Sequence, residues 1–147
     1  MIPIKYRIKT AEKNDIINHL NNCSSEFVPK LVTYVDIQIY SQKIFDKAIT
    51  FEAWNDNDLI GLIAVYLNNS KGFITNISVD KSFKGLGVFK GLINLCFDLC
   101  KVLKVDQVDL EIYKKNKKVI DIYKHIGFNF MQNQQYENRL VMFYKLN

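Results

Sequence analysis

Apolar and polar residues change their spacing several times along the chain, and each change marks an expected element. Residues 4–8, IKYRI, alternate apolar and basic side chains, which predicts a half-buried strand. Thr10 then stands where its side chain would cap a helix that runs to about Asn22. Residues 28–48 have mixed spacing, with Pro29 near a helix start, and indicate one broken helix or two short ones.

Five later runs predict strands. Residues 48–54, 59–67 and 72–79 are rich in β-branched and aromatic residues, and the polar turns NDND and NNSKG separate them. We therefore expect an antiparallel meander. Residues 107–113, QVDLEIY, and 139–146, RLVMFYKL, predict two further strands near the carboxyl terminus.

Helical patterns occupy residues 86–104 and 116–127. The shorter helix has Asn116 as its expected N-cap and Gly127 as its stop. The longer helix carries apolar residues at spacings of three and four. We expect its buried face to consist of Phe89, Ile93, Cys96, Cys100 and Leu103.

The middle of the chain has the order strand, glycine turn, helix, strand. Two strands joined in this way are parallel, and the turn lies at the carboxyl edge of the first strand, where open α/β sheets bind ligands. Together with the meander, this order predicts an α/β protein with a mixed sheet. The length of 147 residues matches a single domain, 1–147.

Composition narrows the class of protein. Hydrophobic residues make up 48% of the chain and charged residues 24%, which is typical of globular proteins. No apolar run approaches the ~20 residues of a membrane span, and the amino terminus lacks the apolar core of a signal peptide. We therefore expect a cytoplasmic protein without a membrane partner.

The cysteines and histidines do not form a metal-binding pattern. Cys23, Cys96 and Cys100 make no CxxC pair or Cys/His cluster, so no metal is expected. Cys96 and Cys100 lie four apart on the long helix and are expected in the core. His19 and His125 are isolated in the sequence, and we expect surface or helix-end positions for both.

The net charge is +5, and its densest cluster is YKKNKK at residues 113–118. An excess of this kind suits an anionic ligand, a nucleic acid or a solvated surface. The lysine run lacks interleaved aromatic residues that could stack on bases. For this reason we do not expect nucleic acid as a partner.

A glycine-rich turn precedes the long helix, in the stretch VDKSFKGLGVFKGLI at residues 79–93. Nucleoside triphosphates, dinucleotides and coenzyme A all bind at such turns, because free backbone N–H groups and the helix dipole favour an anion there. No G-K-[ST] follows, which excludes a Walker loop. Gly85, Gly87 and Gly91 give G-x-G-x-x-x-G after an antiparallel meander, which argues against a dinucleotide fold.

At these residues the sequence resembles the GNAT superfamily, the acetyl-CoA-dependent N-acetyltransferases. The family pattern of Gln or Arg, two residues, Gly, one residue, then Gly or Ala falls on Lys84, Gly87 and Phe89. The segment ISV from Ile77 resembles the end of the family's fourth strand, and the likeness is strongest over residues 72–128. The block LEIYKKNKKVIDIYKHIGF resembles the last diagnostic block of the family, with matching residue types at Glu111, Asn116, Ile120, Tyr123, Gly127 and Phe128.

The resemblance implies about seven strands, helices on both faces of the sheet, and a parallel central pair splayed around acetyl-CoA. The backbone of Ile77 and Val79 would pair with the pantetheine arm, and amides from Gly85 to Lys90 would hold the pyrophosphate. Asn116 would contact the pantetheine or only cap its helix. The expected cofactor-binding residues are Ile77, Ser78, Val79, Lys84, Gly85, Leu86, Gly87, Val88, Phe89, Lys90, Asn116 and Tyr123.

Two residues depart from the family pattern. Lys84 keeps a positive charge but loses the planar set of donors that Arg offers. Phe89 places a large side chain where the backbone must approach the pyrophosphate. If its ring turns into the core, the amide stays available; if the ring turns outward, it obstructs the coenzyme.

The resemblance also implies a chemistry. Glu111 falls where relatives that acetylate protein amino termini have a proposed base, and a strand-face carboxylate in a structural hydrogen bond is the alternative. Tyr123 falls at the family's acid position, and an aromatic core residue is the alternative. The leading hypothesis is an N-acetyltransferase that acts on a primary amine of a small molecule or peptide. The other hypotheses are a non-catalytic acyl-CoA-binding module and a nucleic-acid binder, and a homodimer stays open.

Overall fold

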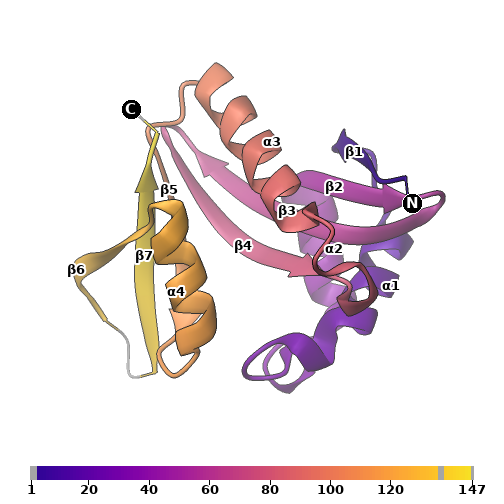
Figure 1. The fold of residues 1–147 in the computed structure, drawn as a ribbon, viewed down its shortest axis with the longest axis horizontal. Coiled ribbons are helices and arrows are strands. Elements are labelled where there is room, and N and C mark those ends of the chain that lie inside the picture. The colour runs from indigo at the N-terminus through magenta and orange to yellow at the C-terminus, as the bar shows by residue number, and fades with distance from the viewer. Residues whose placement is uncertain (1–2, 136–137, 147) are drawn as a thin grey trace.

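Seven strands form one mixed sheet in the order β1-β2-β3-β4-β5-β7-β6 (Figure 1). The computed structural model describes residues 3–135 and 138–146. The strands are β1 Lys5–Ile8, β2 Ile49–Asn55, β3 Asp58–Asn68, β4 Lys71–Val79, β5 Gln107–Tyr113, β6 Asn129–Gln135 and β7 Arg139–Lys145. The helices are α1 Lys13–Cys23, α2 Ile37–Lys47, α3 Val88–Val102 and α4 Lys117–Ile126. The single α/β domain with a mixed sheet, expected from the sequence, is confirmed.

The parallel pair in the centre of the sheet is short. β2, β3 and β4 pair antiparallel, as the predicted meander requires, and β1 pairs antiparallel with β2. β4 and β5 run parallel, but only Lys71–Ile74 of β4 pairs with Gln107–Leu110 of β5. Beyond Ile74 and Leu110 the two strands move apart, and Figure 1 shows β4 diverging from the unit of β5, β7 and α4. The predicted splayed pair is therefore present in the sheet.

A β-bulge in β4 lies directly after the last parallel pair. Ile74 pairs with Val65, but Asn76 pairs with Ala64, so Thr75 is an extra residue in the β4 strand. A bulge bends a strand and increases its local twist. Thr75 therefore turns the remainder of β4, up to Val79, away from β5.

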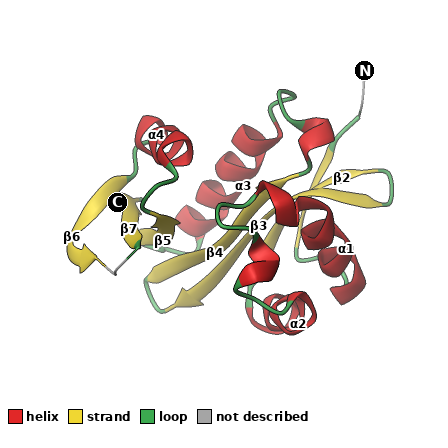
Figure 2. Ribbon diagram, turned by 90° about the horizontal axis from the view of Figure 1, so that it is seen from below, coloured by secondary structure: helices red, strands yellow, loops and turns green. Residues whose placement is uncertain are grey.

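Helices cover both faces of the sheet, as expected. Figure 2 shows α1 and α2 on one side and α3 and α4 on the other. One buried cluster joins α3 and α4 to the sheet, and it includes Cys96 and Cys100, whose predicted core positions are confirmed. A second buried cluster lies under α1 and α2 and includes Ile16, Leu20 and Ile44. Each helix thus buries one apolar stripe, which supplies most of its stability.

Gly61 on β3 lets α3 approach the sheet closely. A Cβ atom at this position would lie 2.9 Å from Val88 Cγ1 and 3.0 Å from Leu92 Cδ1. Both side chains belong to the first turns of α3, and both are buried. The contact fixes the amino-terminal end of α3, together with the glycine turn before it, relative to the sheet.

The amino-terminal end of α1 differs from the prediction. Glu12, not Thr10, is the N-cap, and Glu12 and Asp15 form a reciprocal capping box. The Thr10 amide and hydroxyl both donate to the carboxylate of Glu52, a fully buried residue of β2. The amide of Ala11, the hydroxyl of Thr50 and the indole N–H of Trp54 donate to the same carboxylate.

These five donors change the titration of Glu52. Burial by itself raises the pKa of a carboxyl group, but the hydrogen bonds from Thr10, Thr50, Ala11 and Trp54 lower the pKa of Glu52 below its ordinary value. The Thr10 side chain does not cap α1 because its hydroxyl donates to the buried carboxylate of Glu52.

The long helix is two residues shorter at each end than expected. It begins at Val88, because Gly87 has a left-handed conformation, and it ends at Val102, before Lys104 with φ of 61°. Leu103 is 47% exposed and was wrongly placed on its buried face, whereas Phe89 is half-buried and packs against the core cluster. The buried face consists of Val88, Leu92, Ile93, Cys96, Phe97 and Cys100.

Residues 28–48 and 129–135 form two further elements. Residues 28–48 form a 3₁₀ turn, Leu31–Thr33, followed by α2, so the helix there is broken. The sequence pattern did not locate β6, Asn129–Gln135, which pairs irregularly with β7 at the edge of the sheet. Its sequence NFMQNQQ lacks β-branched residues and so carries little strand signal.

Candidate active site

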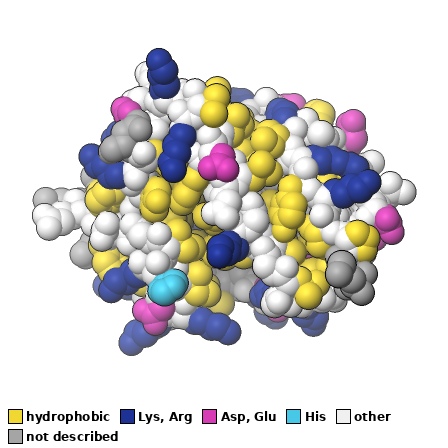
Figure 3. Space-filling model, turned by 45° about the horizontal axis from the view of Figure 1, so that its top comes forward, with side chains coloured by type: hydrophobic (Ala, Val, Ile, Leu, Met, Phe, Trp, Pro, Cys, Tyr) yellow, Lys and Arg dark blue, Asp and Glu magenta, His cyan; other side chains and the backbone are white. Residues whose placement is uncertain are grey.

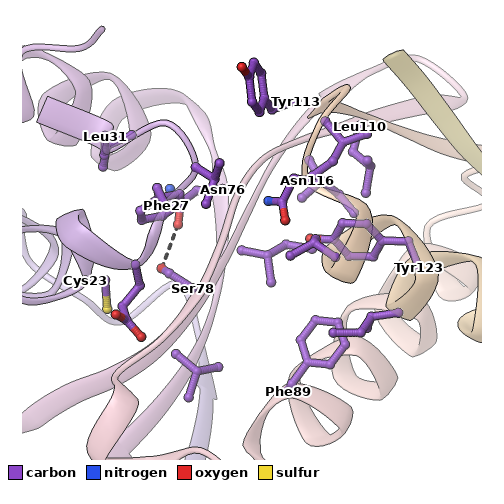
Figure 4. A pocket seen from close by; sticks show the side chains of 18 of the residues that line it. Cys23, Phe27, Leu31, Asn76, Ser78, Phe89, Leu110, Tyr113, Asn116 and Tyr123 are labelled. Atoms are coloured by element: carbon purple, nitrogen blue, oxygen red, sulfur yellow. Dashed lines mark hydrogen bonds between the residues drawn. The ribbon is translucent and has the colours of Figure 1, made fainter. Parts of the chain in front are cut away.

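A cavity of about 900 Å³ opens where β4 and β5 separate. Its walls come from β4, from β5 and α4, from the turn before α3, and from the segment between α1 and α2. Figure 4 shows Asn76 and Ser78 on one wall and Asn116 and Tyr123 on the other. Of the residues predicted from the sequence, all except Leu86 and Lys90 line this cavity.

The glycine turn leaves one end of the cavity open. Gly85 and Gly87 have φ of 83° and 77°, a conformation that favours glycine, and a Cβ atom at either position would meet nothing within 4 Å. The first helical hydrogen bond runs from the Gly91 amide to the Gly87 carbonyl, at 3.0 Å. The amides of Val88, Phe89 and Lys90 precede it in α3 and have no helical partner.

This end of α3 fits an anion. Gly87 is the N-cap and has no side chain that could satisfy the amides, and α3 adds the positive end of its dipole. Lys84 lies beside the turn, 3.1 Å from Glu26, with 55% of its side chain exposed. Leu86 and Lys90 are exposed and do not line the cavity; Leu86 lies in the turn before α3 and Lys90 in the first turn of α3.

The ring of Phe89 turns toward Tyr123. The two ring centroids are 6.3 Å apart with the planes tilted by 53°, and Phe89 lies at the base of the cleft in Figure 4. The side chain therefore packs between α3 and α4 and does not project over the glycine turn. The alternative in which Phe89 turns outward is wrong, and its amide is free for a ligand.

Tyr123 is a buried residue of α4. The side chain is 7% exposed, and its ring also packs against Phe128, with centroids 5.5 Å apart. Burial raises the pKa of the Tyr123 hydroxyl. The phenol therefore stays protonated at neutral pH and can act as a donor at the cavity wall.

Glu111 and Asn116 complete this wall. Glu111 is exposed on β5 and lines the cavity, and no described residue forms a hydrogen bond with its carboxylate. Asn116 is the N-cap of α4 by position, but its side chain makes no capping hydrogen bond. Figure 4 shows this side chain reaching into the space between β4 and α4. The stop of α4 at Gly127, with φ of 124°, agrees with the sequence.

His19 was wrongly expected at the surface or at a helix end. It is 1% exposed on the buried face of α1, where Nδ1 lies 3.1 Å from the Leu59 carbonyl oxygen and Nε2 lies 2.8 Å from Ser78 Oγ. Burial lowers the pKa of His19 to about 4. The sequence contained a signal for this, because His19 falls on the stripe of Ile16, Leu20 and Cys23.

Tyr40 is a second residue that the sequence did not assign to the site. Its hydroxyl donates to the Thr75 carbonyl at 2.7 Å and lies 2.8 Å from Thr75 Oγ1. Burial raises the pKa of Tyr40 to about 12. Tyr40 thus ties α2 to the bulge in β4, beside the point where the strands separate.

Outside the cavity, we looked for a basic surface patch, a metal-binding group and a membrane-spanning helix. On the face drawn in Figure 3, Lys and Arg side chains are spread out with apolar side chains between them. Across the described residues, no group of three or more His, Cys, Asp or Glu side chains could hold a metal ion. No helix in the described part of the chain is long and apolar enough to cross a membrane.

Solved structures share this fold. Ribosomal-protein-S18-alanine N-acetyltransferase from Escherichia coli is 14% identical, with a TM-score of 0.77 over 97% of this chain and 95% of that one. PaiA N-acetyltransferase from Thermoplasma acidophilum, solved in complex with coenzyme A, is 15% identical, with a TM-score of 0.81 over 97% and 99%. A GNAT-family acetyltransferase from Staphylococcus aureus Mu50 is 18% identical, with a TM-score of 0.76 over 97% and 100%.

A search of curated protein sequences gave no match. The sequence itself matches the model of the acetyltransferase (GNAT) family over residues 14–128. This range begins in α1 and ends at Phe128, and it includes the glycine turn, β5 and α4. The match covers most of the chain, and the splayed sheet and the open end of α3 agree with it. The chain therefore belongs to the GNAT family of acetyltransferases.

Proposed function

We propose that this protein is an N-acetyltransferase that moves the acetyl group of acetyl-CoA to a primary amine of a small molecule or peptide. The observation that carries the proposal is the cavity at the β4–β5 separation, which has an anion-binding helix end at one side and Glu111 and Tyr123 on its wall. The reaction is direct attack of the amine on the thioester through a tetrahedral intermediate. It needs no metal.

The residues present fit acetyl-CoA. The amides of Val88, Phe89 and Lys90 receive the pyrophosphate, and the open space at Gly85 and Gly87 lets the phosphates come close to the backbone. Past Ile74 and Leu110 the strands are unpaired, so the backbone of Ile77 and Val79 on β4 would hold the pantetheine arm like an added strand. The residues of both cavity walls would then face the thioester.

Glu111 serves as the base. A lysine-like amine is unprotonated about once in 2,500 molecules at pH 7, and an α-amine about once in six. Either acceptor must lose a proton before or during the attack. The Glu111 carboxylate is exposed to the cavity and is not engaged by any described residue, so it can take that proton directly or through a water molecule.

Tyr123 serves as the acid. When the C–S bond breaks, the coenzyme A thiolate needs a proton, and the buried, protonated Tyr123 hydroxyl can supply it. For ordinary pKa values of about 10 and 8.5 this transfer would cost about 2 kcal/mol, and the raised pKa of Tyr123 makes the cost larger. The transfer leaves free coenzyme A and the acetylated amine as products.

A non-catalytic acyl-CoA-binding module is the second candidate. Phe89 occupies the position of a small residue, and the ammonium group of Lys84 is already paired with Glu26 at 3.1 Å. The ion pair of Lys84 favours weaker coenzyme binding than the family pattern would give, while the ring of Phe89 packs toward Tyr123 and leaves its amide free. The proposal further places the protein in the cytoplasm, with an amine acceptor as partner, without nucleic acid or membrane partners, and with a homodimer still open.

The test measures binding and turnover separately. Acetyl-CoA at millimolar concentration is expected to raise the melting temperature, since a ligand that binds only the folded state stabilises it. A panel of spermidine, glucosamine, L-alanine amide and a hexapeptide with a free amino terminus is then assayed for release of free thiol. A thermal shift without turnover on any amine would select the binding module. A shift with NADH or ATP but none with acetyl-CoA would overturn both candidates.

A further inference from the structure

Two oppositely charged side chains, Glu111 on β5 and Arg139 on β7, lie on one face of the sheet at the cavity. Glu111 pairs with Val141, and Tyr113 pairs with Arg139. Residues that oppose each other in an antiparallel pair share a face, and so do residues two apart on one strand. Glu111, Tyr113 and Arg139 therefore share a face. All three line the cavity, where Figure 4 shows Tyr113 at the end opposite Phe89.

This face is turned toward the segment between α1 and α2. The residues that alternate with Glu111 on β5, Leu110 and Ile112, belong to the buried cluster of α3 and α4 on the other side of the sheet. On the side of Glu111, the guanidinium carbon of Arg139 lies over the ring of Tyr34, 5.2 Å from its centroid. Tyr34 lies just before α2, so this contact crosses the cavity from β7 to the α1–α2 segment.

The guanidinium group of Arg139 is held in place but is not paired. Its contact with Tyr34 is a cation–π interaction, which orients the group without using an acceptor. Arginine has five N–H donors, and no described residue accepts a hydrogen bond from Arg139 or forms an ion pair with it. Glu111 and Arg139 do not pair with each other, because the ion pair of the described residues is Lys84–Glu26. One ligand can therefore meet an open carboxylate and an open guanidinium.

The two open groups are close enough for a small ligand. Glu111 and Arg139 are diagonal neighbours across the β5–β7 pair, a relation with about 7–8 Å between the two positions. An ammonium group on Glu111 and an anion on Arg139, each held by a hydrogen bond of about 2.8 Å, must then be near each other in the ligand. The amine and carboxylate of an α-amino acid are. Lys118, the remaining charged residue of the lining, belongs to α4 on the other side of the sheet.

Apolar side chains line the cavity on the same side. Val28, Tyr34 and Phe73 line it and are 50%, 47% and 36% exposed. Phe27 and Leu31 extend this lining along the α1–α2 segment, and Figure 4 shows both on that wall. Covering exposed apolar surface with an apolar ligand group is favourable. The lining therefore fits an apolar side chain beside the amine and the carboxylate.

We propose that the acceptor is an α-amino acid with an apolar side chain, and that Arg139 binds its carboxylate. This inference rests on the proposed N-acetyltransferase function and names the class of amine. Arg139 is a specificity-determining residue, because its planar fork matches a carboxylate. Tyr34 is a positioning residue that holds the fork in the cavity.

The reaction balances with these groups. Glu111 takes one proton from the ammonium group, and the free amine attacks the thioester. The N–C bond forms and the C–S bond breaks. The nitrogen loses a second proton as the amide forms, which balances the proton that Tyr123 gives to the coenzyme A sulfur. The products are an N-acetylamino acid, whose carboxylate is still bound to Arg139, and free coenzyme A.

The test compares L-leucine with L-leucine amide, in which the carboxylate is replaced by a neutral group. Arg139→Met removes the charge and keeps most of the length of the side chain. The ratio of kcat/KM for leucine to kcat/KM for the amide should fall about 10- to 100-fold in this variant, as expected for a lost hydrogen bond to a charged group. The two amines differ in basicity, but this difference cancels because both enzymes are measured with the same pair.

The change should lie in KM for leucine, with kcat within about threefold and Kd for acetyl-CoA within about twofold of wild type. Arg139→Lys keeps the charge without the fork and should retain part of the preference. Tyr34→Leu should lower the ratio about three- to tenfold, whereas Tyr34→Phe keeps the ring and should keep the ratio. Arg7→Met is the matched control, because Arg7 lies over Trp54 at 5.5 Å but does not line the cavity.

Three outcomes of the kinetics would overturn the inference. The first is an unchanged ratio in Arg139→Met. The second is a wild-type protein that acetylates spermidine or glucosamine but not L-leucine. The third is a higher kcat/KM for 2-aminoethylphosphonate or for the hexapeptide than for leucine, which would mean a phosphoryl group or a longer acceptor.

Binding of the product separates this inference from the proposed function. With coenzyme A present, N-acetyl-L-leucine should raise the melting temperature more than N-acetyl-L-leucine amide does, and Arg139→Met should remove the difference. If the products bind in this way but no amine is acetylated, the proposed function is wrong, and with it the role of the amino acid as acceptor. If leucine amide is acetylated and the two products bind equally, the function stands and the role of Arg139 is wrong.

Discussion

Two glutamates of the sheet, Glu52 on β2 and Glu111 on β5, have opposite surroundings. Glu52 is completely buried and accepts hydrogen bonds from two amides, two hydroxyls and an indole. Glu111 is exposed at the cavity, where no described residue bonds to it. The acceptor sites of Glu52 are filled by the protein, so this carboxylate stabilises the fold, whereas those of Glu111 are open and available to a substrate.

The regions around the two residues differ in the same way. Around Glu52, β1, β2 and the start of α1 are joined by hydrogen bonds to one carboxylate, and the ladder of β2 with β3 is long. On the β4 side of β5, four parallel pairs end at Leu110, just before Glu111, and the space beyond them is a cavity; on the other side Glu111 pairs with Val141 of β7. Substitutions in the first region should lower stability, and substitutions in the second should lower coenzyme binding or turnover.

Tyr123→Phe should have the largest effect on turnover. Only the hydroxyl is removed, so Kd for acetyl-CoA and the melting temperature should stay close to wild type. The rate constant kcat should fall by about 10² to 10⁴, the usual contribution of a positioned acid. Steady-state kinetics with a panel amine give the result, and a wild-type kcat would leave Tyr123 as a packing residue.

Gly87→Asp should weaken acetyl-CoA binding about a hundredfold or more, because it places a negative side chain beside the amides of α3. The φ of 77° also strains any residue other than glycine. Gly87→Asn is the matched control, since it has the same shape and tolerates this conformation but carries no charge. Isothermal titration on both variants separates charge from strain. Equal affinities for Asp and Asn would show that the turn does not face the phosphates.

Glu111→Gln should reduce kcat/KM by about 10- to 100-fold near pH 6 and by less near pH 9, because the base matters most while the acceptor amine is protonated. Stability should change by less than about 0.5 kcal/mol, as at other exposed positions. The measurement is a pH profile of kcat/KM with a chemical melt beside it. If kcat/KM fell by the same factor at every pH, Glu111 would not act as the base.

Glu52→Gln should have the smallest effect on turnover and the largest on stability, a loss of about 1–3 kcal/mol, because the amide presents an NH₂ group to donors that need an acceptor. The pKa of Glu52 is lowered in the folded state, so its contribution is complete above the unfolded value of about 4.3 and is lost as the pH falls through the folded pKa. Wild type should therefore lose stability below about pH 4 more steeply than the variant does. Urea unfolding between pH 7 and pH 3 checks this, and equal slopes would show that Glu52 does not titrate with folding.

The sequence predicted what depends on local pattern. The strand QVDLEIY was located at its observed bounds, since its apolar residues Val108, Leu110 and Ile112 alternate and are buried. The glycine turn and the cap position of Asn116 were found because glycine and asparagine have specific backbone roles. Most of the predicted site follows from these two stretches, which the topology brings to one cavity.

What the sequence did not predict depends on contacts between distant segments. Threonine often caps helices, but the amide and hydroxyl of Thr10 both donate to the Glu52 carboxylate, 42 residues away. His19 needs the Leu59 carbonyl and Ser78 hydroxyl of two other strands to be stable in the core. The ring of Phe89 is directed by Tyr123 on α4. Long-range partners decide each of these, although the apolar stripe of α1 did carry a signal for the burial of His19.

The short parallel ladder between β4 and β5 has a consequence for the colloidal behaviour of the protein. Past Ile74 and Leu110 the facing sides of the two strands are unpaired with each other, so the molecule has two internal sheet edges in addition to its outer ones. Unpaired edges are templates for strand addition and aggregation. A coenzyme arm lying between them would cover both edges at once. With the proposed function, bound acetyl-CoA would therefore reduce self-association of the protein through these edges.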